Sequence, residues 1–473
     1  MTGTAEGVFH YEPWEGDLMD RHVTASTLQN YLDGNDDVRV LNINAPWGTG
    51  KTWFIKRWHD EMQKTRPTVY FNAWKNDHIN DPFIAVVSAI TEQAKSQMNT
   101  SEKINEAVKQ LGRKAGSALI SAAPALLNTI IKHKLGVDIE KFIEGANAEA
   151  IGEATEHAVE ALISSNKQAL EEVENFRAEL ARLAKALSID VAEQTGSPEA
   201  PLYIFIDELD RCRPTYSIEL LERIKHFFDV DNCKFVIASD TGQLCHSIGV
   251  VYGAGFESRR YLYRFFDSEY GLENQDIESL VIAELDWGSD ELSRLGVRRG
   301  THDSNGMFFG DEIIKLRSGD LIPINDDVKE YHIMVLALAQ WFSLDLRTLK
   351  QCLSRVRFVY LNHSHGEFHI FWAFFLVVVS KLHPDSYKDF KASGVLAGLP
   401  KTEGSFYFGV FRVSFLELAG FYYRAMNDPR VFLSTMSSGN NRAKGRLAEK
   451  VVGEDSGLKK YFDLVELSYS LNA

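Results

Sequence analysis

Four short apolar runs in the first half of the chain have the pattern of buried β-strands. The runs are Val38–Asn44, Thr68–Asn72, Leu202–Ile206 and Lys234–Ser239. The third is unbroken, as in a parallel sheet that is covered on both faces. Between the runs, apolar residues recur at helical spacing, as they do from Phe54 to Met62. Strands that alternate with helices predict a doubly wound α/β core with right-handed crossovers.

The residues between the second and third runs, Asp81 to Glu199, are Ala-rich with a helical pattern, and they predict an insertion in the core. Late in this insertion, apolar residues step by three and four over about two heptads. They are Leu170, Val173, Phe176, Leu180, Leu183 and Leu187. At this length, a helix that packs against its own domain is the favoured interpretation, and a dimerising coiled coil is the alternative.

Two further apolar stretches bear on membrane association. Gly116–Ile131 has no charged residue, but it is shorter than the ~20 apolar residues that a spanning helix needs. A buried helical hairpin is the favoured interpretation, ahead of a membrane-surface segment and of a true span. Ile370–Val379 is also too short, which favours a core helix or a buried strand. We therefore expect a chain that purifies without detergent.

The alternation of strands and helices fades beyond about Asp267. The rest of the chain has a mostly helical pattern, with a loop-rich stretch at Gly296–Asp311. The predicted organisation is therefore a core formed by residues 1–80 and 200–267, a helical insertion at residues 81–199, and a mainly helical C-terminal domain at residues 268–473.

Composition narrows the class of protein. The chain is 45% apolar and 25% charged, which is typical of globular proteins. Its net charge of −15 argues against a surface that binds nucleic acid over most of its area. A local basic helix with Arg347, Lys350, Arg355 and Arg357 keeps a DNA-sensing or DNA-translocating function open. Four sparse cysteines and an N-terminus without a signal-peptide pattern predict a reduced, cytoplasmic chain.

The segment Ala45–Thr52 (APWGTGKT), between the first strand and the first helix, has the pattern of a phosphate-binding loop. Gly48 and Gly50 let the backbone approach a phosphate closely, and Lys51 brings charge to the β- and γ-phosphates. The Thr52 hydroxyl is a ligand for Mg²⁺. The signature G-x-x-x-x-G-K-[ST] is met except at its first position, where Ala45 replaces glycine. The residues expected to contact a nucleotide, ATP in this interpretation, are Pro46, Trp47, Gly48, Thr49, Gly50, Lys51, Thr52 and Trp53.

Acidic residues end the third and fourth strands. Asp207 can hold the Mg²⁺ shell, and Glu208 can act as a base on the water that attacks the γ-phosphate. Asp240 can orient the same water, or it can cap the helix that begins near Thr241. Several arginines follow these strands, and each can stabilise transition-state charge or only pair with surface acids. They are Arg211, Arg213, Arg259, Arg260 and Arg264.

Five motifs carry a resemblance to a known family: PWGTGKT, FNAW at Phe71–Trp74, IDELDRCRP at Ile206–Pro214, FVIASD at Phe235–Asp240 and the YLYRFF helix. Together they resemble the KAP family of P-loop NTPases. It spans about Asp20 to Asp267. In addition, LDLRTLKQCL at Leu344–Leu353 resembles a later helix of the family, with Leu346 in place of a proline. The resemblance implies that Arg347 is a second sensor of the γ-phosphate.

The resemblance also implies an additional-strand P-loop core, in which one strand separates the two Walker strands, and Mg²⁺-dependent hydrolysis of ATP. Family members often carry transmembrane helices where Gly116–Ile131 lies, and this insert is shorter and more polar. Bacterial members are implicated in phage exclusion and other defence systems, beside separate effector proteins.

The leading hypothesis is an ATPase switch that acts on a protein partner. A nucleotide-bound scaffold that does not hydrolyse is the alternative. Arg259 and Arg260 further predict self-association, because P-loop ATPases commonly complete their site with an arginine from a neighbouring subunit.

Overall fold

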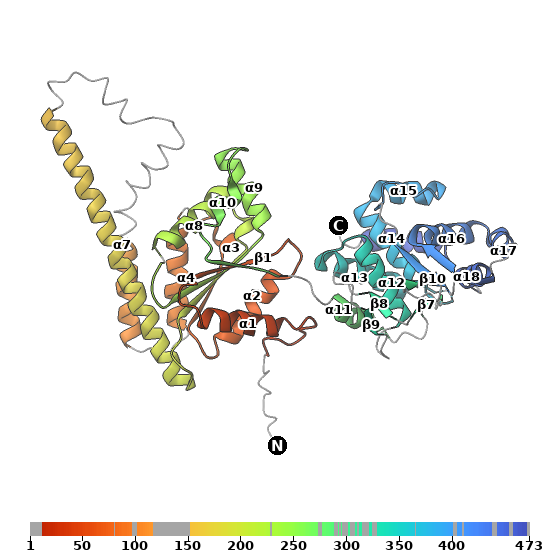
Figure 1. Ribbon diagram of the computed structural model, residues 1–473, viewed down its shortest axis with the longest axis horizontal. Coiled ribbons are helices and arrows are strands. Elements are labelled where there is room, and N and C mark those ends of the chain that lie inside the picture. Colours follow the sequence, from red (N-terminus) through yellow and green to blue (C-terminus); the bar gives the residue numbers. More distant parts are fainter. Residues whose placement is uncertain are drawn as a thin grey trace, which may run out of the picture. The chain divides into compact units, whose positions relative to one another are not determined.

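In the computed structural model the chain forms two compact units, Met1–Glu273 and Asn274–Ala473 (Figure 1). In the first unit it describes residues 12–79, 81–96, 102–116, 152–227 and 229–272. In the second unit it describes residues 277–287, 292, 295, 301–302, 308–309, 312–314, 321–323, 329–364, 366–400, 404–408, 411–437, 442–453 and 457–470.

A five-stranded parallel sheet forms the centre of the first unit, in the order β2-β3-β4-β1-β5. The strands are β1 (Val40–Asn44), β2 (Thr68–Asn72), β3 (Leu202–Asp207), β4 (Cys233–Ser239) and β5 (Ser268–Gly271). The first four are the strands that the hydrophobic pattern predicts. β4 lies between β1 and β3, as the family resemblance implies. β5 extends the sheet past the predicted boundary at residue 267, and it has no apolar run because its residues alternate between half-buried and exposed.

Helices cover both faces of this sheet, as a doubly wound core requires. On one face, α1 (Arg21–Asp33) and α2 (Lys51–Met62) share a buried cluster with apolar residues of β1, β3 and β4. The other face is covered by α4 (Pro82–Ser96), α7 (Gly152–Thr195), α8 (Pro214–Phe227), α9 (Thr241–Tyr252) and α10 (Ser258–Leu262). The predicted doubly wound α/β core is therefore confirmed for this unit.

The insertion contributes helices to the same core. On α7, Phe176, Leu180, Leu183 and Leu187 are buried in a cluster that includes residues of β2 and β3. The Phe176 ring lies 4.9 Å from that of Phe83 on α4, centroid to centroid. The described part of the heptad-like seam therefore packs inside its own unit. The side chain of Leu170 and residues 117–131 lie outside the described residues.

The second unit is mainly helical and packs around α14 (Ile370–Leu382), in which every residue from Ile370 to Val379 is buried. The apolar run at Ile370–Val379 is thus a core helix. The other helices described in this unit are α11 (Ile277–Glu284), α12 (Glu330–Trp341), α13 (Leu346–Asn362), α15 (Pro384–Ser393), α16 (Phe415–Asn427), α17 (Pro429–Ser437), α18 (Arg442–Val452) and α19 (Lys460–Ser470). In the described part of the chain, no helix has both the length and the apolar character needed to cross a membrane.

Among the described residues of this unit, three short antiparallel strand pairs interrupt the helices, and the hydrophobic pattern does not indicate them. They are β6 (Thr301–His302) with β7 (Phe308–Phe309), β8 (Glu312–Ile314) with β9 (Leu321–Pro323), and β10 (Ser405–Phe408) with β11 (Phe411–Ser414). Strands of two to four residues are too short to show a period of two, which explains why the sequence does not reveal them.

Candidate nucleotide site

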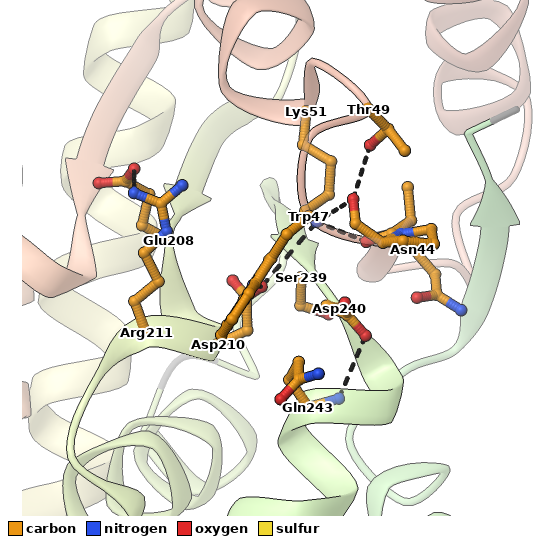
Figure 2. Close-up of polar contacts among 12 residues, drawn as sticks. Asn44, Trp47, Thr49, Lys51, Glu208, Asp210, Arg211, Ser239, Asp240 and Gln243 are labelled. Atoms are coloured by element: carbon orange, nitrogen blue, oxygen red, sulfur yellow. Dashed lines mark hydrogen bonds and ion pairs between the residues drawn. The ribbon is translucent and has the colours of Figure 1, made fainter. Parts of the chain in front are cut away.

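The candidate site lies at the carboxyl edge of the sheet. In the strand register, Asn44 of β1 pairs with Ser239 of β4, and Asn72 of β2 pairs with Asp207 of β3. The loop after β1 and the acids that end β3 and β4 therefore lie together. Figure 2 shows Trp47 and Lys51 of this loop close to Asp210 and Asp240. Ligands of open α/β sheets bind at this edge.

Two glycines shape the loop between β1 and α2. Gly48 has φ 87° and Gly50 has φ 86°, a left-handed conformation that side chains disfavour. Gly50 is the N-cap of α2, which begins at Lys51, so the loop ends on the amino terminus of a helix. The Thr49 hydroxyl donates a hydrogen bond to the Pro46 carbonyl at 2.9 Å and closes the turn. Loop amides and a helix N-terminus in this arrangement favour a bound phosphate.

Arg21 of α1 supports the loop from outside the predicted motifs. Its side chain is buried, with 4% of the residue exposed, and its Nη2 donates to the Thr49 carbonyl at 2.9 Å. Burial lowers the pKa of the guanidinium, and the charge of Asp17 opposes that effect. No motif signal identifies Arg21, because it precedes the first strand by a whole helix.

Lys51 is buried and turns back onto its own loop. Its Nζ donates to the carbonyls of Ala45 at 2.5 Å and Pro46 at 3.2 Å, and it lies 3.9 Å from Oδ2 of Asp210. Burial lowers the pKa of the ammonium, while the charges of Asp210, Asp240 and Asp207 oppose that effect. A triphosphate must therefore draw Lys51 away from partners that the loop itself provides.

Thr52 and Asp207, the two predicted metal ligands, are in contact. The Thr52 hydroxyl donates to Oδ1 of Asp207 at 3.2 Å, and the Tyr70 hydroxyl donates to Oδ2 at 2.8 Å. Burial raises the pKa of the Asp207 carboxyl, and these hydrogen bonds oppose it. Among the residues that the structure describes, no group of three or more His, Cys, Asp and Glu side chains could hold a metal ion. A hydroxyl beside one carboxylate fits Mg²⁺, which takes most of its other ligands from water and substrate phosphates.

Glu208, the predicted base, has both carboxylate oxygens engaged. Its Oε2 accepts a hydrogen bond from Nδ2 of Asn72 at 2.7 Å, and its Oε1 lies 2.5 Å from Nη1 of Arg211. Its backbone has φ 61°, which is rare outside glycine and more frequent at functional sites. The Arg211 guanidinium also lies over the ring of Trp74, 5.4 Å from its centroid. Figure 2 shows the Glu208–Arg211 pair apart from Lys51.

Asp210 is a site residue that the motif analysis did not assign to the site. Its Oδ2 accepts a hydrogen bond from Nε1 of Trp47 at 2.5 Å, so it links the loop after β1 to the segment after β3. Two elements of that segment, β3 and the 3₁₀ helix η1 (Leu209–Arg211), set its position. In the sequence, Asp210 is marked only as the third acid of the DELD run. That its side chain faces the loop depends on η1, which the sequence pattern does not show.

Asp240 caps α9, which was the alternative interpretation of this residue. Its Oδ1 accepts from the backbone N–H of Gln243 at 3.1 Å, while its charge still acts on Lys51 (Figure 2). Trp53, a predicted nucleotide contact, is the third residue of α2. Its ring packs edge-on against that of Trp14, with the ring centroids 5.9 Å apart, and the Arg57 guanidinium lies over it.

The arginine candidates have separate surroundings. Arg213 donates from Nε to Oδ1 of Asp77 at 2.7 Å, which ties it to the end of α3 (Ala73–Asn76). On α10, Arg259 donates from Nε to the Tyr263 hydroxyl at 2.9 Å, and Arg260, whose side chain is 81% exposed, lies 3.3 Å from Glu257. Among the contacts of the described residues, none joins these three arginines to Lys51.

Arg347 and the basic helix belong to the second unit. Arg347 is exposed in the first turn of α13. On the same helix, Lys350 lies 4.0 Å from Glu284, and the Arg355 guanidinium lies 3.5 Å from the centroid of the Tyr469 ring. Two of the four basic side chains of this helix, Lys350 and Arg355, therefore already contact side chains of the same unit.

A family model described as the KAP family P-loop domain matches residues 21–268. No curated protein matches the chain. The matched range begins at Arg21 and ends at Ser268, so it includes α1, the phosphate-binding loop and the acids after β3, and it covers more than half of the chain.

Proposed function

Because the chain belongs to the KAP family of P-loop NTPases, we propose that it binds ATP with Mg²⁺ and hydrolyses it. One observation supports the proposal above the others. Thr52 and Asp207, which are 155 residues apart in the sequence, lie in hydrogen-bond contact beside the loop that ends on α2. A hydroxyl and a carboxylate at that place are the ligand pair that a Mg²⁺-nucleotide complex needs.

Different residues bind the phosphates and the Mg²⁺ ion. The backbone amides from Gly48 to Thr52 and the N-terminus of α2 cradle the phosphates, and Lys51 moves from the Ala45 and Pro46 carbonyls to the β- and γ-phosphate oxygens. Thr52 and Asp207 would hold Mg²⁺. When bound, the ion neutralises phosphate charge and keeps the triphosphate in one geometry.

Glu208 acts on the attacking water from a position that its present partners hold. Its Oε2 accepts from Asn72 and its Oε1 pairs with Arg211, and each oxygen keeps a second lone pair that can receive a proton. Either oxygen can therefore take the proton of a water in line with the γ-phosphate. Asn72 also accepts from the Lys75 backbone N–H at 2.8 Å, so its position depends on α3.

Release of inorganic phosphate tests the proposal. With ATP and Mg²⁺, the full-length chain should release phosphate, and chelation of Mg²⁺ should reduce the rate by at least about a hundredfold, because neutralisation of phosphate charge is lost. The assay measures phosphate over time with and without chelator. A chain that binds ATP tightly yet releases no phosphate would contradict the proposed hydrolysis.

That outcome would favour the second candidate, a scaffold that binds nucleotide without hydrolysis. The observation in its favour is the engagement of Glu208 by Asn72 and Arg211, two partners that compete with water for the carboxylate. The intact set of Lys51, Thr52, Asp207 and Glu208 supports hydrolysis, because a scaffold needs no base.

We further propose that the ATPase acts as a switch for a protein partner and that it self-associates. The support is the exposure of Arg260 on α10, together with the need of P-loop sites for an added cation. We also propose a role in defence against phage, which is supported by the family resemblance. Proteins that co-purify with the chain in the presence of ATP, and not in its absence, would identify the partner.

Mixed subunits test the self-association. Neither an Arg259→Ala/Arg260→Ala chain nor a Lys51→Ala chain should hydrolyse ATP alone. Their mixture should regain activity, because one supplies the nucleotide site and the other the arginines. Specific activity of the parent chain should also rise with its concentration. Flat activity across dilution, with no rescue on mixing, would place the acting arginine within the same chain.

A further inference from the structure

Asp210 is a buried carboxylate that has no role in the proposed hydrolysis. Its side chain is 2% exposed, and Nε1 of Trp47 donates to its Oδ2 at 2.5 Å. Nζ of Lys51 lies 3.9 Å from the same oxygen. Figure 2 shows the three side chains together, with Asp210 facing the loop. Lys51 is the cation that binds the β- and γ-phosphates in P-loop proteins.

The position of Asp210 is fixed from two directions. An indole N–H can only donate, so Trp47 holds Oδ2 toward the loop. Beneath Asp210, the Ser217 hydroxyl of α8 donates to the Leu209 carbonyl at 3.0 Å, which anchors η1. The carboxylate is therefore not free to turn away when a ligand enters the loop.

A triphosphate in the loop places its charge near this carboxylate. At its present place, Nζ of Lys51 lies 3.9 Å from Oδ2 of Asp210, so a γ-phosphate oxygen bound there would lie within about 7 Å of the carboxylate, since a hydrogen bond adds about 3 Å. Movement of Lys51 onto the phosphate would leave the charge of Asp210 less compensated. Like charges at this distance repel more strongly in a site that excludes water than in bulk solvent. A diphosphate lacks the γ-phosphate and is repelled less.

We infer that Asp210 determines specificity: its carboxylate, held by Trp47 beside Lys51, lowers the affinity of the site for nucleoside triphosphates relative to diphosphates. This inference rests on the proposed function. Its consequence is that the triphosphate state depends on a further cation, such as an arginine from another subunit, to offset the charge of Asp210.

Binding measurements on full-length Asp210→Asn test the inference. Asparagine keeps the shape of aspartate and still accepts a hydrogen bond from Trp47, but it carries no charge. With Mg²⁺ present, its affinity for a non-hydrolysable ATP analogue should rise about tenfold, and its affinity for ADP less than about twofold. The quantity compared is the ratio of the two dissociation constants in the variant and in the parent chain.

Two further variants control the result. Trp47→Phe keeps an aromatic ring but removes the donor, so the ratio should change in the same direction by a smaller factor. Asp231→Asn removes an equal charge from a side chain that is 85% exposed at the other end of β4, and its ratio should equal that of the parent. An unchanged ratio in Asp210→Asn, or a selective loss of affinity for the analogue, would overturn this inference but leave the proposed function standing. A parent chain that binds neither nucleotide would overturn the proposed function with it.

Discussion

Replacement of Lys51 by alanine is expected to weaken ATP binding by at least about a hundredfold, because two charge-assisted contacts to phosphate oxygens are lost. Lys51 is also buried among the Ala45 and Pro46 carbonyls and close to Asp210. The substitution should therefore lower the free energy of unfolding by about 1–3 kcal/mol, as expected when a buried carboxylate loses a nearby cation. Both units should nevertheless remain folded.

Titration with a fluorescent ATP analogue and thermal unfolding measure the two effects separately. Lys56→Ala is the matched control, because Lys56 is an exposed lysine on the same helix, α2. Its affinity for the analogue should equal that of the parent chain. An affinity of Lys51→Ala within a few-fold of the parent would remove the Ala45–Thr52 loop from the nucleotide site.

Glu208→Gln should bind ATP with nearly the parent affinity and hydrolyse it at least about a hundredfold more slowly, because a positioned base contributes that much to the rate. Glutamine keeps the length of the side chain, and its carbonyl oxygen can still accept from Asn72 or from Arg211. It cannot take a proton from water. The expected change is therefore confined to turnover, as measured by phosphate release at saturating ATP.

Glu193→Gln is the control for this variant, because Glu193 is an exposed residue of α7. Unchanged turnover in Glu208→Gln would assign the base to a different carboxylate, such as Asp210 or Asp240, whose charges act on Lys51. Loss of Mg²⁺-ATP binding would instead place Glu208 among the metal ligands. The two failures are distinguishable, because one appears only in turnover and the other already in affinity.

The sequence by itself determined the parts of this protein that depend on local pattern. Short apolar runs predicted the strands β1 to β4, and the unbroken run at Leu202–Ile206 is typical of a strand that is buried on both faces. The run APWGTGKT predicted a loop that ends on a helix, because Gly48 and Gly50 adopt backbone conformations that other residues disfavour. The same reasoning fails for β5, whose residues are half-buried or exposed and therefore leave no apolar run.

Only the tertiary structure decided which side chains meet at the site. Asn72 reaches Glu208 because β2 and β3 are neighbours in a register that pairs Asn72 with Asp207. Trp47 reaches Asp210 because the loop after β1 and helix η1 after β3 share one edge of the sheet, even though β4 separates the two strands. Arg21 reaches Thr49 because α1 packs against α2 on one face of the sheet.

The physical reason is how far along the chain each feature extends: secondary structure depends on neighbouring residues, whereas side-chain contacts in the site join residues that are far apart in the sequence. Burial and backbone conformation leave periods and residue types in a short segment, so a sequence shows them directly. A contact between groups 28, 136 or 163 residues apart depends on strand order, register and helix packing, which no short segment contains. For this protein, the sequence therefore indicates a phosphate-binding loop and its acids, and the fold decides that Glu208 is held by Asn72 and Arg211 and that Asp210 faces Lys51.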